Sequence, residues 1–173
     1  MPVMRAVGGL IRGAVAGAVA TAAKDLVWFR RYCADGGDQS FGTWELSTDA
    51  TDFGEDAPAP ARVGKRVADL FGVELDDSLV GPTNNVVHWL TGVGWGQAAG
   101  LVAHVLPVPA LGVGLATGVG AWGTSYVALG RLGIYKPISE YDAPTLWTDL
   151  SAHLVFGLAL GATLRALGVR RRR

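Results

Sequence analysis

The sequence predicts an all-α fold in which four helices cross a membrane as a bundle. Half of the 173 residues are hydrophobic and only 17% are charged, against about 25% in ordinary soluble domains. Charges are also missing from long stretches, the longest of which is residues 86–130. In lipid, only helices and closed barrels satisfy the backbone hydrogen bonds, and alternating strand patterns are absent. A soluble four-helix bundle is the alternative, but its helices would carry a polar outer stripe.

The first predicted span covers about residues 4–28. A hydrocarbon core of about 30 Å requires about 20 helical residues, and this stretch is free of acidic residues as far as Lys24. A signal peptide is the rival interpretation of residues 1–23, with Arg5 and Arg12 in its basic region. Both interpretations remain open at this point.

The charge-free run predicts two further spans, at about 85–106 and 110–130. The run is too long for one helix, and Pro107 and Pro109 lie near its middle. Proline removes a backbone donor and ends helices. We therefore expect a tight turn at the two prolines between two antiparallel helices.

The fourth span is predicted at about 145–167. Asp142 is placed to cap its first turn, and Pro144 suits the first helical position. Gly168 follows the last turn, where a left-handed residue commonly ends a helix. The four spans make one membrane domain of residues 1–173.

Residues 31–84 are predicted to form a loop on the outer side of the membrane. The segment holds four basic and eleven acidic residues. An amphipathic helix is expected near 60–72, lying on the membrane surface or capping the bundle. Residues 34–58 are interpreted as an acidic loop, since their acidic residues lack the spacing of a calcium-binding EF-hand.

The basic residues predict that both chain ends are cytoplasmic. The first 24 and the last 24 residues contain no acidic residue, and cytoplasmic loops carry the excess of Lys and Arg. We expect the C-terminal arginines to contact anionic lipid headgroups. These residues are Arg165, Arg170, Arg171, Arg172 and Arg173.

Glycines recur every four residues along the predicted spans. Helices in lipid associate by close packing, and small residues spaced in this way allow it. The candidate packing residues are Gly9, Gly13, Gly17, Gly92, Gly96, Gly100, Gly157 and Gly161. The pattern fits contacts within one chain, with a second copy or with another membrane protein.

The candidate functional site is a cluster of Asp25, His88, Asp149 and His153 near the outer ends of the spans. Ionisable residues inside a membrane are expensive and commonly functional. Asp149 and His153 are four residues apart, so they share a helix face. Four roles are open: an interhelical hydrogen-bond clamp, a proton or ion path, ligation of haem by the two histidines, and zinc binding by His88, His153 and Asp149.

No nucleotide-binding, metalloprotease or serine-hydrolase motif is present. We therefore expect a membrane protein that is not an enzyme, needs no cofactor and has a structural or interaction role. A proton- or ion-conducting module is the second hypothesis, and a haem or metal protein is the third. The low charge and the lack of a basic excess exclude a nucleic-acid binder.

Several of these residues carry a resemblance to a known family. The most specific stretch is Lys136–Asp142, followed by Asp149 four residues before His153 at the head of the last span. With its His88-led second span, the chain resembles the YagU-like family of uncharacterised bacterial inner-membrane proteins. The resemblance implies a plasma-membrane location. It implies no established activity and supplies no catalytic residues.

Overall fold

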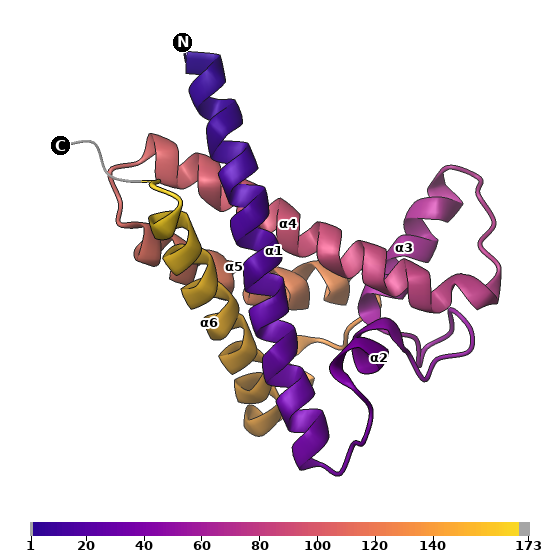
Figure 1. Ribbon diagram of the computed structural model, residues 1–173. Coiled ribbons are helices and arrows are strands. Elements are labelled where there is room, and N and C mark those ends of the chain that lie inside the picture. Colours follow the sequence, from indigo (N-terminus) through magenta and orange to yellow (C-terminus); the bar gives the residue numbers. More distant parts are fainter. Residues whose placement is uncertain (1, 170–173) are drawn as a thin grey trace.

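The computed structural model describes residues 2–169 and contains helices but no strand over them, which confirms the all-α part of the predicted fold class. Four long helices form the body (Figure 1). Two shorter helices come between the first and the second of these in the sequence. The long helices are α1 (Pro2–Ala34), α4 (Val80–Val105), α5 (Ala110–Arg131) and α6 (Ala143–Ala166). The shorter ones are α2 (Phe41–Leu46) and α3 (Ala59–Leu70), with single 3-10 turns at Asp77–Leu79 and Ile138–Glu140.

The long helices lie within a few residues of the predicted spans, except at the end of α1. That helix runs on to Ala34 instead of ending near residue 28. The apolar pattern continues through Phe29, and the side chain of Arg31 donates to the carbonyl oxygen of Thr148 at 2.9 Å on α6. Gly36, with a φ of +95°, follows the helix and turns the chain.

The caps of α6 confirm the predicted helix start and stop. The side chain of Asp142 accepts a hydrogen bond from the Thr145 amide at 2.7 Å. Hydrogen bonds from the Thr145 side chain and then from this amide hold the pKa of Asp142 below its usual range, because only the ionised form is a pure acceptor. Gly168 ends the helix with a φ of +75°, a conformation that a side chain would strain.

The sequence predicted that residues 34–58 form an acidic loop. This prediction is wrong for part of the segment, which is helical. The short helix α2 begins after Ser40, whose side chain accepts a hydrogen bond from the Thr43 amide at 3.3 Å. Phe41 and Trp44 then pack against Phe29 of α1, with ring centroids 5.3 and 5.5 Å away. Aromatic contacts of this kind hold α2 against the end of α1.

The predicted amphipathic helix corresponds to α3, which packs on α4. A Cβ added at Gly64 would overlap the Thr83 side chain, so the two helices are in close contact there. Arg62 also donates to the carbonyl oxygen of Ile134 at 3.0 Å and so ties α3 to the loop after α5. Leu70 and Phe71 at the far end are exposed.

Two interfaces with glycines at their centres hold the long helices together. In the α1–α4 glycine interface, a Cβ at Gly13 would overlap the Gly96 carbonyl, and one at Gly17 would lie 2.5 Å from the Gly92 carbonyl oxygen. In the α5–α6 glycine interface, a Cβ at Gly114 would overlap the Gly157 carbonyl. Both interfaces join helices of the same chain, and α1 also packs along α6.

The buried core is small and lies between these two interfaces. Its members are alanines of α1 and α4 together with larger side chains of α5 and α6. Ala16, Ala20, Leu160 and Leu164 are fully buried. The large apolar side chains of α1 point outward instead, and Ile11 is 61% exposed.

We expect Gly96→Ala to destabilise the protein by about 1–3 kcal/mol, the usual cost of overpacking. The new Cβ would overlap the backbone of Gly13 and Gly17, which cannot move without parting the helices. Gly94→Ala is the matched control, because a Cβ there meets nothing within 4 Å. Thermal unfolding in detergent measures both variants. Equal midpoints for the two would contradict this packing.

Candidate functional site

Asp25 and His88 form a direct pair between α1 and α4. The Nε2 atom of His88 lies 3.0 Å from both carboxylate oxygens of Asp25. Asp25 is only 4% exposed, and a buried carboxylate is costly unless it is paired. The pair follows from the α1–α4 glycine interface, because Asp25 lies two helical turns beyond Gly17 along α1.

Asp149 and His153 form a second pair, within α6. The Nδ1 atom of His153 lies 3.0 Å from the Asp149 carbonyl oxygen and 3.4 Å from its carboxylate. A carbonyl oxygen only accepts, so Nδ1 is the donor. In the neutral ring, Nε2 is then left as a proton acceptor.

Both pairs border one cavity of about 590 Å³, which is lined by His88 of the first pair and by both residues of the second. It is lined by side chains from all four long helices and is bordered by Pro60 and Val63 of α3. Its ionisable lining residues are Lys24, His88, Asp149 and His153. Neutral polar groups on its wall include Thr21, Asn84, Thr91, Ser125 and Tyr135. We call this space the polar cavity.

The predicted cluster of four residues is therefore divided into two pairs that share the polar cavity. His88, Asp149 and His153 line this space, whereas Asp25 is not among its lining residues. Asp25 instead faces α2 beside Glu45. Sequence spacing could pair Asp149 with His153 on one helix, but it could not tell which residues meet across helices.

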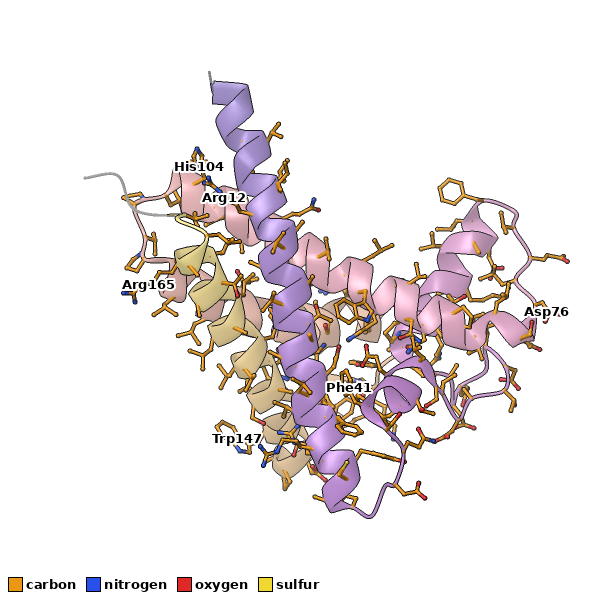
Figure 2. The ribbon with its side chains drawn as sticks, viewed as in Figure 1. Arg12, Phe41, Asp76, His104, Trp147 and Arg165 are labelled. Carbon is orange, nitrogen blue, oxygen red and sulfur yellow. The ribbon has the colours of Figure 1, made fainter. Side chains whose placement is uncertain are left out.

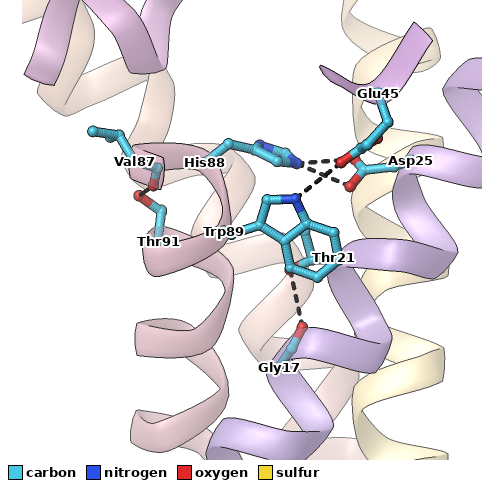
Figure 3. Close-up of polar contacts among 8 residues, drawn as sticks. All are labelled: Gly17, Thr21, Asp25, Glu45, Val87, His88, Trp89 and Thr91. Atoms are coloured by element: carbon cyan, nitrogen blue, oxygen red, sulfur yellow. Dashed lines mark hydrogen bonds and ion pairs between the residues drawn. The ribbon is translucent and has the colours of Figure 1, made fainter. Parts of the chain in front are cut away.

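Glu45 is the functional residue that the sequence interpretation missed. It lies on α2, where its Oε1 atom accepts a hydrogen bond from Nε1 of Trp89 at 2.9 Å (Figure 3). Burial, and then the negative charge of Asp25, raise the pKa of Glu45 above its usual range. The signals for its position were Ser40 as a helix cap and the aromatic residues around it.

Asp25, Glu45 and His88 come close enough together to hold a metal ion. One ligand atom from each lies within 4.8 Å of the others, in the part of the chain that the structure describes. Figure 3 shows the two carboxylates and the imidazole converging from α1, α2 and α4. The predicted zinc set of His88, Asp149 and His153 is not such a group among the described residues.

Tyr135 reaches the polar cavity from the loop after α5. Burial raises its pKa to about 12, so the phenol keeps its proton at physiological pH. Its ring lies 5.4 Å from that of Tyr126 and 6.4 Å from that of Tyr141, measured between centroids. Of these three rings, Tyr135 is the one that lines the cavity.

Arg165, one of the predicted lipid-contacting arginines, lies at the opposite end of the molecule from this site. Figure 2 places Arg165 near Arg12 and His104, far from Phe41 and Trp147 at the other end. Arg165 and Arg12 are exposed. The remaining candidates, Arg170 to Arg173, lie outside the described residues.

The chain was compared with protein-family models, with curated proteins and with solved structures, and none of them matches it. The resemblance to the YagU-like family therefore stays a prediction from the residues that carry it.

We expect Ser125→Cys, made in a Cys33→Ser background, to react readily with a small charged methanethiosulfonate in detergent. Ser125 lines the polar cavity, and Cys33 is an exposed native thiol that would otherwise react. Ala99→Cys is the matched control, since Ala99 is 2% exposed in the core. Mass spectrometry follows both labelling reactions. Similar labelling rates for the two would mean that water does not reach the cavity.

Proposed function

We propose that this protein is a four-span protein of the bacterial plasma membrane that carries protons through its polar cavity. One observation carries the proposal: four ionisable side chains line a single cavity between long helices with apolar outer faces. Intramembrane ionisable residues mark ion and proton pathways. A purely structural clamp would be satisfied by the two hydrogen-bonded pairs and needs no cavity.

The outer surfaces of the long helices support a membrane location. Large apolar side chains are exposed along every one of them. Examples are Val7, Ile11 and Val15 on α1, Leu90 and Val102 on α4, Val119 and Val127 on α5, and Leu158 on α6. Soluble proteins rarely expose contiguous apolar surface on this scale, whereas lipid requires it.

The composition of the individual helices supports a membrane location for α1 more strongly than for the other long helices. By length and composition, α1 is the one described helix that passes as a membrane span, over Ala6–Ala34. The helices α4 and α5 are rich in glycine, which contributes little to mean hydropathy. Their small residues serve packing, and glycine is frequent in transmembrane helices for this reason.

The placement of charge supports an orientation with both chain ends in the cytoplasm. Arg12 and Arg165 lie at the end of the bundle where α1 begins and α6 ends (Figure 2). In the acidic segment, α2 packs on the last turns of α1, and α3 lies to one side of the bundle with its start beside the polar cavity. By the positive-inside rule, the cavity then faces the outside.

The polar cavity contains the groups that a proton carrier needs. The carboxylate of Asp149 and the acceptor nitrogen of His153 are groups of the type that accept and pass on protons in proteins. His88 and Lys24 line the same space from α4 and α1. The glycine interfaces bring backbones into contact farther along the bundle. This contact favours a carrier that opens to the two sides of the membrane in turn, rather than a pore that is open throughout.

A reporter experiment tests the membrane orientation. We expect green fluorescent protein fused after Arg173 to fluoresce, and alkaline phosphatase inserted after Glu74 of the full chain to be active, because Glu74 lies in the exposed acidic segment. The reciprocal fusions should be silent. A chain that stays in solution without detergent after ultracentrifugation would contradict the membrane location itself.

A flux experiment tests proton movement. The protein is reconstituted into liposomes that contain a trapped pH-sensitive dye, and a potassium gradient with valinomycin drives proton entry. We expect His153→Leu and Asp149→Asn to reduce the flux by about tenfold or more, as is usual when a proton-transfer group is lost. His104→Leu is the matched control, because His104 lies at the opposite end of the bundle.

The outcome separates proton transport from the structural role. Flux that needs His153 and Asp149 but not His104 supports the carrier. Flux equal to that of empty liposomes, or equal in all variants, contradicts it and leaves Asp25–His88 as a clamp between α1 and α4 and Asp149–His153 as a structural pair within α6. Thermal unfolding in detergent shows whether each variant is folded, so loss of flux is scored only for folded protein.

A further inference from the structure

We propose that Asp25, Glu45 and His88 form a binding site for a divalent transition-metal ion, in which α1, α2 and α4 each supply one ligand. The site lies beside the polar cavity and shares only His88 with it, since Asp25 and Glu45 are not among the cavity-lining residues. The proposal therefore goes beyond proton transport and stands or falls separately.

The distances between the ligand atoms suit a small ion. The three atoms lie within 4.8 Å of one another, and His88 Nε2 is already 3.0 Å from Asp25. Bonds of about 2.0–2.2 Å in tetrahedral geometry place ligand atoms roughly 3.3–3.6 Å apart. To reach that arrangement, His88 and Asp25 must separate by a few tenths of an ångström from 3.0 Å, while the Glu45 carboxylate moves to a similar distance from both.

The charge of the site suits a divalent ion. Two carboxylates and a neutral imidazole carry two negative charges, which one divalent cation balances. A proton on His88 would balance only one of them, and Asp25 is 4% exposed. Among the described residues, no Lys or Arg side chain forms an ion pair with either carboxylate within 4.0 Å, and the charge of Lys24 acts on both from farther away.

The ligands are held by other contacts, as in established metal sites. The Nε1 atom of Trp89 donates to Glu45 Oε1 at 2.9 Å and orients that carboxylate. Outer hydrogen bonds of this kind fix the ligands and raise affinity. The packing of Phe41 and Trp44 on Phe29 holds the backbone of α2 in place. Figure 3 shows Trp89 directly below the converging ligands.

The ligand types define the class of metal. One imidazole with two carboxylates suits zinc, manganese, iron(II) or cobalt(II), which accept mixed nitrogen and oxygen ligands. Magnesium and calcium prefer oxygen alone. Three protein ligands leave at least one coordination position for water or for an anion from the outer solution.

Titration of the metal-stripped full chain in detergent with zinc tests the site. We expect one zinc ion per chain by calorimetry and mass spectrometry. Glu45→Gln and His88→Gln should each weaken binding by more than about 100-fold, because a direct ligand contributes more than an outer partner, whose loss costs 10–100-fold. Trp89→Phe should fall in that lower range.

Matched controls keep the result specific. Glu74→Gln changes the same group on the same acidic segment at an exposed position and should bind zinc like the wild type. His153→Leu should also bind normally, so failure of the proton carrier and failure of the metal site are distinguishable. Zinc should raise the unfolding temperature of the wild type but not of Glu45→Gln, which shows in addition that the variant is folded.

Cobalt(II) supplies a spectroscopic readout of the same site. Visible absorption bands typical of a low-coordinate cobalt ion should appear with the wild type and vanish on addition of zinc. Zinc binding that is unchanged in Glu45→Gln or His88→Gln would overturn the proposal. So would the absence of zinc binding by the stripped wild-type chain.

Discussion

The backbone contact between α1 and α4 is the constraint on which the candidate site depends. Gly13 and Gly17 approach Gly96 and Gly92 so closely that no side chain fits between them. This contact fixes the register of two antiparallel helices, and the next step along the same four-residue spacing sets Thr21 beside Gly92 and brings Asp25 to His88. A buried carboxylate and its partner therefore meet because glycines farther along the helices set their positions.

The polar cavity results from the same packing. Helices that touch at glycines cross at that point and separate on either side of it, and Figure 1 shows α4 leaning away from α1 toward its own first residues. The resulting gap is occupied on one side by α2 and on another by α3. The polar cavity lies between the four long helices and the start of α3, where hydroxyl, imidazole and carboxylate groups replace the small apolar residues of the core.

Much of this arrangement could be predicted from the sequence. The charge-free stretches and the two prolines located the long helices, because hydrophobic length and proline geometry act locally. The glycine spacing indicated the packing surfaces, and the ionisable residues within helices were few enough to single out Asp25 and His88. Glu45 could not be found in this way. Its helix has six residues, and contacts with Phe29 and Trp89, distant in sequence, hold it in place. An acidic loop and an ordered ligand-bearing helix have similar local composition.

The glycine interfaces also bear on how the proposed carrier would move. Side chains that interdigitate must repack when helices slide, and dense packing resists that change. In the α1–α4 and α5–α6 interfaces, smooth backbone surfaces meet at glycines instead, so a rocking motion needs fewer side chains to change position. The α1–α6 contact, tied by Arg31 to Thr148 and Ser151, joins one member of each interface. It would keep α1 and α6 together while α4 and α5 move, and such a motion would open the cavity at its closed end.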